Sequence, residues 1–580
     1  MSKLRAVCAP LLAALLSVAG CSRNEAPRRA PIILISIDTL RADHVGCYGY
    51  SRDTTPSIDS FANEGVRFTT AISQYPGTLK SHMSMFTSLY PEVHRVDDDS
   101  ALDPRRPTLA EILKTAGYQT AGFVYDCRWL EPRYGFDRGF DRYEVNVADG
   151  EERTAGALDW LDHRAHPRPE VLIRALQVDQ APNLLRGDQV LNSSRALELS
   201  LPGNVHGQTL TVVARTTLTT GAPTVLVLYV DGRPMARWPV TDSDFAAHQV
   251  RADLRPGAAL HLQLESLEAR PATDTQKTSA SAPPYFLFLH YYDVHSDWKQ
   301  LPYESPPPYE TMFTPKRETP FTGCDDSGVC ASRYLLKLNE QNLPVSEEDL
   351  AYMRALYDGG VRYTDHEIGL LLEGLKKRRL YDEALIIITA DHGEEFRDHG
   401  RFLHEQIYDE LVHVPLLLKL PQGRRAARTV EDEVETIDLA PTILEVAGVS
   451  PPQSWQGRSV LPLLDASSEA ARPAYSSSTA VGRAVRTRHW KLIQSTGGKD
   501  VELYNLARDP GEHRNVLAEA SRAATAERLA RRLEAWAGDN RRRIDELTMA
   551  APAGTARSGT TVNLSDSDKE RLRSLGYDVK

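Results

Sequence analysis

Acidic and histidine side chains follow short apolar segments at three places in the chain: Asp38, Asp293 and His295, and Asp391 and His392. Carboxylate oxygens suit hard divalent cations, and imidazole nitrogens suit borderline ones. A metal held by such a set can polarise an anionic ester oxygen and lower the pKa of a bound hydroxyl. An aspartate that follows a strand is also a common helix cap or turn residue, so these residues alone do not establish a metal site.

The candidate nucleophile is Thr78, in the stretch from Tyr75 to His82. A Pro-Gly pair followed by the apolar stretch 83–89 predicts a helix that begins at Thr78 or soon after it. A hydroxyl there lies among backbone N–H groups that favour an anion and stabilise developing negative charge. The simpler interpretation is that Thr78 or Ser81 only caps the helix.

The elements that must position these residues form an α/β pattern. Three segments have the uninterrupted apolar character of strands buried on both faces of a parallel sheet: Ile32 to Ile37, Tyr285 to Leu289, and Leu385 to Thr389. Helical spacing of apolar residues appears in Thr108 to Ala116 and in Tyr363 to Lys376. In open α/β sheets the ligand site lies outside the carboxyl ends of the strands. The acidic clusters are therefore expected to converge at that edge.

A β-rich segment interrupts this pattern between residues 170 and 270. Its runs QTLTVVARTTLTT, PTVLVLYV and HLQLESL alternate as strands do, and Asp231-Gly232 is placed as a hairpin turn. A linker rich in Thr, Ser, Ala and Pro, 271–284, follows it. We expect an inserted β-sandwich that serves either as a structural or shielding insert or as a sugar-binding module.

Taken together, these segments resemble the sulfatase family of the alkaline phosphatase superfamily in order and spacing. The matching stretches are PIILISIDTLRADHVGCYGY, TLKSHMSMFTSLYPEVH, TLAEILKTAGYQTAGF, GFDRGFD, YFLFLHYYDVH, TADHGEEFRDHG, HEQIYDELVHVPLLLK, ETIDLAPTILEVAGV and ELYNLARDPGEHRNV. They extend over roughly Pro31 to His163 and Pro284 to Val516. The resemblance implies a doubly wound α/β sheet of the alkaline phosphatase and sulfatase type, with a smaller C-terminal subdomain and the inserted β-sandwich.

The resemblance also implies roles for particular residues. Four of them would bind a divalent metal: Asp38, Thr78, Asp391 and His392. Thr78 would in addition be the nucleophile. Two histidines would contact the oxyanion of the ester as catalytic residues, His295 and His404.

Several positions depart from the pattern of true sulfatases. Thr78 stands in the place of the cysteine that becomes formylglycine, and threonine cannot undergo that conversion. Thr39 replaces the second metal aspartate, and His82 replaces the signature arginine. His404 stands where lysine is usual, and His392 stands where asparagine is common. The set resembles phosphodiesterases and phosphoethanolamine or phosphoglycerol transferases of the superfamily. Manganese or zinc is therefore favoured, with calcium as the alternative.

We expect a metal-dependent hydrolase that cleaves sulfate or phosphate esters, carried by a glycan or a lipid-linked molecule, through Thr78. One alternative is a phosphodiesterase or a phosphoethanolamine- or phosphoglycerol-type transferase. Another is a non-catalytic surface protein that binds glycans through the β-rich insert. The net charge of -11 leaves no overall basic surface, so no nucleic-acid partner is expected. Asp293, Asp365 and His366 are candidates for a second metal, although the last two lie in a helical pattern typical of a solvated or capping role.

The first residues predict an export signal. Lys3 and Arg5 precede the apolar run 11–18, which is too short to span a bilayer. The sequence Val-Ala-Gly before Cys21 resembles a bacterial lipoprotein signal in which that cysteine is lipidated; an ordinary signal peptide is the alternative. We expect a lipid-anchored protein of the cell envelope, on the periplasmic or outer-membrane face. Oxidation there would allow Cys324 and Cys330 to form a disulfide.

These observations divide the chain into consecutive segments. They are a lipoprotein signal (1–21), the first part of the catalytic domain (31–165), the inserted β-sandwich (170–270), the second part of the catalytic domain (284–465), a C-terminal subdomain (466–516) and a charged helical tail (517–580).

Overall fold

The computed structural model describes most of the chain. The described ranges are 29–125, 127–146, 149–164, 170–179, 183–185, 188–191, 196–216, 224–241, 245–265, 283–296, 301–318, 320–325, 328–424, 427–465 and 472–549. The predicted lipoprotein signal with Cys21, most of the linker 271–284 and the end of the helical tail therefore lie outside the described residues. No helix within these ranges combines the length and the apolar character that crossing a membrane requires.

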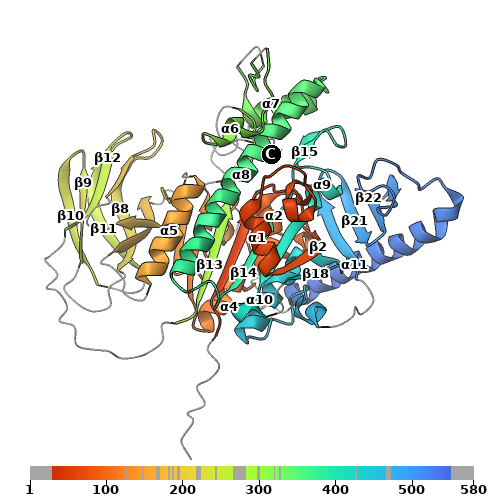
Figure 1. Ribbon diagram of the computed structural model, residues 1–580. Coiled ribbons are helices and arrows are strands. Elements are labelled where there is room, and N and C mark those ends of the chain that lie inside the picture. Colours follow the sequence, from red (N-terminus) through yellow and green to blue (C-terminus); the bar gives the residue numbers. More distant parts are fainter. Residues whose placement is uncertain are drawn as a thin grey trace, which may run out of the picture.

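A nine-stranded mixed sheet forms the centre of the molecule (Figure 1). Its order is β18-β2-β17-β14-β1-β13-β3-β4, and β19 also pairs with β2. The strands are β1 (Ile32–Ile37), β2 (Val66–Ile72), β3 (Gln119–Tyr125), β4 (Arg142–Asn146), β13 (Tyr285–Tyr291), β14 (Leu385–Ala390), β17 (His413–Lys419), β18 (Arg428–Val430) and β19 (Val434–Glu435). The three strands predicted from their apolar character, β1, β13 and β14, are confirmed as parallel neighbours. Antiparallel β17 makes the sheet mixed.

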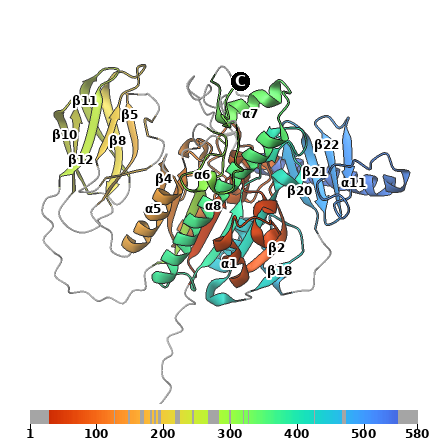
Figure 2. The same ribbon diagram turned by 45° about the horizontal axis from the view of Figure 1, so that its top comes forward.

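Helices cover both faces of this sheet, as predicted for a doubly wound fold (Figures 1 and 2). One group comprises α1 (Pro56–Glu64), α5 (Gly150–His163) and α8 (Glu347–Lys377), and the other comprises α2 (Thr78–Thr87), α4 (Leu109–Thr115) and α10 (Leu439–Ala447). Both faces of the central strands are therefore buried, which accounts for their uninterrupted apolar sequences.

Helices α4 and α8, which contain the two predicted helical patterns, begin at side-chain caps. The predicted helix at Thr108 is confirmed as α4, which starts with a capping box: Glu111 N–H donates to the Thr108 side chain, and Thr108 N–H donates to the Glu111 carboxylate. α8 begins at Glu347, well before the predicted start at Tyr363. The Ser346 hydroxyl caps it, and acidic residues fill its first turn, where they favour helix formation.

The β-rich segment forms two four-stranded antiparallel sheets with orders β10-β9-β12-β7 and β11-β8-β5-β6. Its strands are β5 (Val171–Val178), β6 (Gln189–Leu191), β7 (Leu197–Ser200), β8 (Gly207–Thr216), β9 (Thr224–Val230), β10 (Arg233–Val240), β11 (Ala246–Leu254) and β12 (Ala259–Glu265). Both sheets contribute to one apolar core, separate from that of the central sheet. Asp231 and Gly232, with φ of 48° and 74°, form the predicted turn between β9 and β10. The sandwich lies to one side of the molecule in both ribbon views (Figures 1 and 2).

A four-stranded antiparallel sheet lies on the other side of the central sheet (Figure 1). It contains β20 (Ala474–Ser478), β21 (Gly482–Thr487), β22 (Trp490–Ser495) and β23 (Val501–Tyr504), and the long helix α11 (Ala523–Met549) packs against it. This sheet forms most of the segment predicted as a C-terminal subdomain, 466–516. Tyr475 stacks on Trp536 of α11 with ring centroids 5.1 Å apart, which joins the sheet to the helix.

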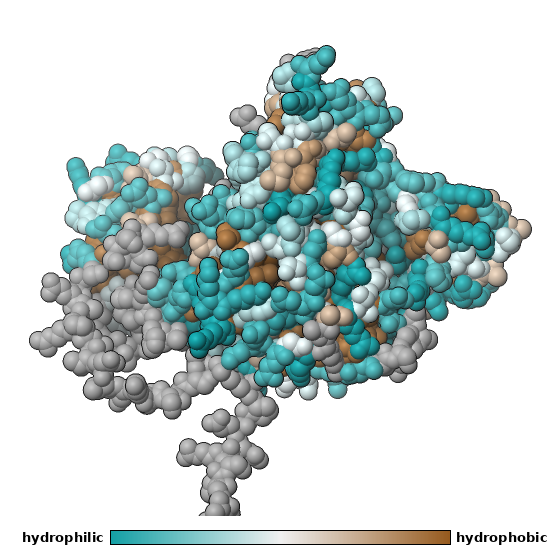
Figure 3. Space-filling view, in the orientation of Figure 1, coloured by the Kyte–Doolittle hydropathy of each residue, from teal (hydrophilic) through white to brown (hydrophobic). Residues whose placement is uncertain are grey.

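Shorter elements complete the fold. They are α3 (Pro91–His94), α6 (Tyr309–Met312), α7 (Ala331–Glu340), α9 (Asp409–Val412), β15 (Glu395–Phe396), β16 (Phe402–Leu403), and 3-10 helices at Ala42–His44, Gly46–Tyr48, Pro132–Tyr134, Pro421–Gly423, Thr436–Asp438, Leu461–Leu464 and Ala520–Arg522. The face of the molecule seen in Figure 3 is predominantly hydrophilic, with apolar residues in scattered groups.

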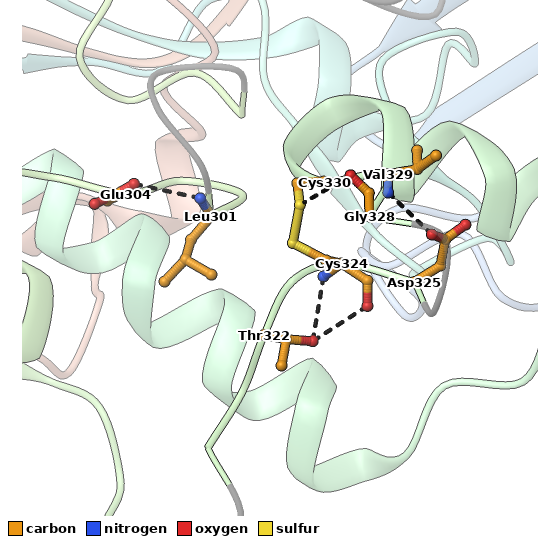
Figure 4. Close-up of a disulfide and its surroundings, with 8 residues drawn as sticks. All are labelled: Leu301, Glu304, Thr322, Cys324, Asp325, Gly328, Val329 and Cys330. Carbon is orange, nitrogen blue, oxygen red and sulfur yellow. Dashed lines mark hydrogen bonds between the residues drawn. A yellow bond between two sulfur atoms is a disulfide. The ribbon is translucent and has the colours of Figure 1, made fainter.

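The predicted disulfide between Cys324 and Cys330 is confirmed (Figure 4). Inside the loop that it closes, Val329 N–H donates to the carboxylate of Asp325. Helix α7 begins directly after Cys330, so the disulfide fixes the chain at the start of this helix. Of the four described cysteines, Cys47 and Cys127 are not joined to each other by a disulfide.

Candidate active site

The strand register brings the predicted metal ligands together. β1 and β14 pair in parallel up to their last residues, and Asp38 and Asp391 are the residues that follow them. His392 comes next. These three side chains are fully buried, and their ligand atoms all lie within 4.8 Å of one another. The convergence predicted at the carboxyl ends of the strands is therefore observed for this pair of strands.

Thr78 is the first residue of α2, and Gly77 is the N-cap. The Thr78 hydroxyl therefore does not cap the helix. It donates to Asp38 Oδ2 at 3.2 Å and lies 3.3 Å from His392 Nε2. The N–H groups in the first turn of α2 favour negative charge at this position. Ser81 does not cap the helix either, because its hydroxyl donates to the Asp391 carbonyl at 2.8 Å.

His392 is held in the form that can bind a metal. Its Nδ1–H donates to the Gly393 carbonyl at 2.9 Å, so the lone pair of Nε2 faces Thr78. Burial lowers the pKa of His392 to about 3, which keeps the ring neutral. Burial, followed by the charge of Asp38, raises the pKa of Asp391 to about 6. Asp391 Oδ2 is buried and makes no hydrogen bond.

These residues fit a divalent cation. The two buried carboxylates, Asp38 and Asp391, repel one another, and histidine rings lie beside both of them. The donor set of two carboxylates, one imidazole and one hydroxyl suits a borderline transition metal better than an all-oxygen site does. A cation bound here would offset the desolvation of both carboxylates.

The sequence interpretation missed His290. It lies inside β13, directly beside Ser36 of β1, and is fully buried. Because Asp38 Oδ2 can only accept, His290 Nε2–H donates to it, at 3.2 Å. Burial lowers the pKa of His290 to about 3, so this donor is neutral. The available signal was a lone histidine within an otherwise apolar strand, FLFLHYY.

His82 lies one helical turn after Thr78 and joins two parts of the site. Its Nδ1–H donates to the Thr78 carbonyl at 2.9 Å and lies 3.4 Å from Asp391 Oδ2. Nε2 then accepts from the Ser36 hydroxyl at 2.9 Å. Burial lowers the pKa of His82 to about 4. His82, which replaces the signature arginine of sulfatases, is therefore a neutral hydrogen-bond donor.

His295 and His404 contact each other beside the metal ligand His392. His404 Nδ1–H donates to the Pro76 carbonyl at 3.3 Å, so its Nε2 accepts from His295 Nε2–H at 3.3 Å. The His404 ring lies 4.4 Å from that of His392, centroid to centroid. Burial, and then the neighbouring histidines, hold the pKa of His404 well below its usual range. The structure thus places both histidines beside the metal ligands.

Glu394 is a further buried acid near the site that the sequence interpretation did not single out. Burial raises its pKa to about 8, although the charge of His295 opposes the shift. A carboxylic acid that stays protonated near neutral pH can donate a hydrogen bond or a proton. Its position two residues after His392 was the available signal.

The candidates for a second metal lie elsewhere. Asp293 accepts from Gly150 N–H at 3.0 Å and pairs with Arg153 at 3.5 Å. Asp365 accepts from two backbone N–H groups in the first turn of α1, at 3.1 and 2.8 Å. His366 is exposed. Asp365 therefore has the capping role that the helical pattern indicated, with the cap formed on a neighbouring helix.

Comparison with known proteins agrees with this fold and site. The Sulfatase family model matches residues 31–156 and 268–449, and the model for the N-sulphoglucosamine sulphohydrolase C-terminal region matches residues 397–539. The chain belongs to the sulfatase family. It is a hydrolase of that family, acting on sulfate or phosphate esters.

The individual relatives have low sequence identity to this chain. N-acetylglucosamine-6-O-sulfatase of Bacteroides thetaiotaomicron is 25% identical over 90% of this chain and 89% of its own length. The multifunctional alkaline phosphatase superfamily protein PehA of Trinickia caryophylli is 26% identical over 75% of this chain and 77% of its own. The structure of a phosphonate monoester hydrolase of Agrobacterium radiobacter superposes with a TM-score of 0.54, at 21% identity, over 88% of this chain and 96% of its own. That structure shares the fold.

Proposed function

We propose that this hydrolase cleaves a sulfate or phosphate ester by attack of the Thr78 hydroxyl, with a manganese or zinc ion held by Asp38, Asp391 and His392. The observation that carries the proposal is the position of the Thr78 hydroxyl, within 3.3 Å of both Asp38 and His392. The sequence alone predicts only that Thr78 lies near the start of a helix. The contacts of its hydroxyl with Asp38 and His392 support the role as nucleophile.

Each residue has a separate role in the proposed mechanism. A divalent cation would lower the pKa of the attacking hydroxyl and neutralise an ester oxygen. Thr78 Oγ1 forms a bond to sulfur or phosphorus, the bond to the leaving oxygen breaks, and the hydroxyl proton passes to Asp38 Oδ2, which already accepts it. In the structure His295 Nε2–H donates to His404 Nε2; in this proposal it donates instead to an ester oxygen or to the leaving group when the substrate binds. Water then cleaves the threonyl ester and restores the hydroxyl.

The proposed substrates are esters of sugars. The relative from Bacteroides thetaiotaomicron, which aligns over most of both chains, is named for a sulfated aminosugar, and this supports a sugar sulfate. An unmodified threonine beside an Asp, Asp and His set supports phosphorus chemistry as the second candidate, a phosphodiesterase or a phosphoethanolamine- or phosphoglycerol-type transferase. The two candidates share the nucleophile and differ in the ester.

The test is the hydrolysis of matched aryl sulfate, aryl phosphate monoester and aryl phosphodiester by the purified protein, supplied separately with Mn, Zn or Ca. Thr78→Ala should lower turnover by about a thousandfold or more, because the covalent route is lost. Ser84→Ala is the matched control, since Ser84 is a buried hydroxyl on the same helix that makes no hydrogen bond. Undiminished turnover in Thr78→Ala would contradict the proposal, and the preferred aryl ester decides between sulfur and phosphorus.

A further inference from the structure

A second group of metal-ligating side chains lies outside the active site, where β15 and α9 meet (Figure 1). It comprises Glu395 on β15, His399 in the turn that follows this strand, and Glu410 in the first turn of α9. One ligand atom from each of these side chains lies within 4.8 Å of the other two. Two carboxylates and one imidazole form a donor set that borderline divalent metals accept.

His399 has the orientation of a metal-binding histidine. Its Nε2–H donates to the Glu512 carbonyl at 3.2 Å, so the lone pair of Nδ1 faces Glu410, whose Oε1 lies 2.5 Å away. The ring stacks on that of Tyr408 with centroids 3.5 Å apart, which fixes its plane. A ligating histidine usually donates its other ring N–H to such a carbonyl or to a carboxylate.

Glu395 is a fully buried carboxylate with one oxygen that makes no hydrogen bond. Its Oε1 accepts from Gln406 Nε2–H at 2.7 Å, whereas Oε2 is the oxygen without a partner. Burial, followed by the charge of Glu410, raises the pKa of Glu395 well above its usual range. Two carboxylates this close need either bound protons or a cation to compensate their charge. A divalent cation would compensate both and would give Oε2 a partner.

The surroundings of the three side chains suit an ion that enters from solvent. The side chains of His399 and Glu410 are 11% and 7% exposed, and Glu395 closes the inner side. Gln406 donates to the His399 carbonyl at 3.3 Å as well as to Glu395. This amide therefore holds two of the three residues in place, as an outer partner of metal ligands does.

We propose that Glu395, His399 and Glu410 bind a divalent metal of the zinc type at a second site, separate from the active-site metal. A water molecule would complete four ligands. The cation takes the place of the protons that otherwise reside on His399 and Glu395, and these protons pass to solvent. Because this segment lies between His392 and His404, the metal would fix the chain that carries both active-site histidines. The inference goes beyond the proposed function and does not depend on it.

The zinc content of the purified protein tests this site without relying on turnover. The protein is stripped with a chelator, loaded with zinc and passed through gel filtration, and bound zinc is counted by native mass spectrometry. We expect two zinc ions per chain. Glu395→Gln, which keeps the acceptor for Gln406, and Glu410→Gln should each retain one. Glu405→Gln is the matched control and should retain two, because Glu405 lies on the same segment but pairs with Arg401.

Asp391→Asn separates the two metals, since it removes a ligand of the active-site ion only. This variant should retain one zinc ion, which is lost when Glu395→Gln is added. Zinc should also raise the unfolding temperature of Asp391→Asn and leave that of the double variant unchanged. Circular dichroism shows whether each variant is folded. If Glu395→Gln is not folded, Glu410→Gln takes its place in both comparisons.

The zinc counts distinguish failure of this site from failure of the proposed function. A single zinc ion per chain that is kept in Glu395→Gln and lost in Asp391→Asn overturns the second site and leaves the proposed function in place. Two zinc ions in both Glu395→Gln and Glu410→Gln also overturn it. If zinc is lost in these variants while the unmodified protein hydrolyses no ester, the second site stands and the proposed function fails.

Discussion

The carboxylates at the strand ends are held by neutral histidines that lie behind them. His290 donates to Asp38, and His82 donates to the Thr78 carbonyl beside Asp391. Hydrogen bonds of this kind fix the orientation of a ligand and raise its basicity. The two histidines therefore act as positioning residues, because they contact the ligands and not the reacting atoms.

Replacing His290 should weaken metal binding more than it weakens the fold. His290→Ala is expected to lower the affinity for Mn or Zn by about 10–100-fold, because Asp38 loses the donor that orients it. His290→Gln, which keeps an N–H donor, should recover part of that affinity. Calorimetric titration of each metal into the metal-free protein measures the effect. His366→Ala on the exposed face of α8 is the control, and an affinity equal to that of the control would contradict a positioning role.

At the scale of elements, α8 packs unusually close to its neighbours. An added Cβ at Gly359 would lie 2.4 Å from the Tyr309 carbonyl oxygen, and one at Gly360 would lie 2.9 Å from that of Asp293. These glycines let α8 touch both the segment that follows β13 and the short helix α6 (Figure 1). The helix therefore supports the segment between Asp293 and His295.

Gly359→Ala should destabilise the protein, although alanine is the better helix former by about 1 kcal/mol. Overpacking against a backbone oxygen is expected to cost about 1–3 kcal/mol net, since the carbonyl cannot rotate away. The shift of the urea unfolding midpoint measures this cost. Gly369→Ala on the same helix is the matched control, because the nearest atom there is the Ser57 hydroxyl, which can rotate. Equal unfolding midpoints for the two variants would show that the close approach of Gly359 to the Tyr309 carbonyl does not limit stability.

At the scale of the whole molecule, buried charges join the small C-terminal sheet to the catalytic domain. Asp409, at the start of α9, pairs with Arg486 at 2.9 Å and with Lys491 at 2.9 Å. Lys491 also pairs with Glu512 at 3.0 Å. Burial alone would raise the pKa of Asp409, but the charges of Arg486 and Lys491 outweigh it and hold this pKa well below its usual range.

This linkage predicts how stability depends on pH. A depressed carboxyl pKa contributes stability that is present above the unfolded value, about 3.9, and is lost as the pH falls towards the folded value. Asp409→Asn should therefore cost about 3–5 kcal/mol at pH 7, because it leaves buried cations with fewer partners. The difference from the unmodified protein should shrink below about pH 4.

Urea unfolding at pH 7, 5 and 3.5, followed by tryptophan fluorescence, measures this difference. Asp545→Asn is the control, since Asp545 is exposed on α11. A difference for Asp409→Asn that stays constant down to pH 3.5 would show that its carboxylate is not the group that links the two parts.

The sequence by itself determined the buried strands, the start of α2, the β-rich insert and the disulfide. These depend on local patterns: apolar runs, a Pro-Gly turn before a helix, alternation, and two cysteines six residues apart. The resemblance to sulfatases added His404 and the division of roles. The segments that match carry those residues in the family's order.

Only the tertiary structure decided which of these residues meet. Strand register sets Asp38 beside Asp391 and brings His290 behind them, whereas Asp293, on the same connection as His295, turns away towards Arg153. A hydrogen bond also joins the hydroxyls of Tyr75 and Thr479, which are about 400 positions apart in the sequence. Such pairings depend on long-range packing of sheets and helices, which no local pattern encodes.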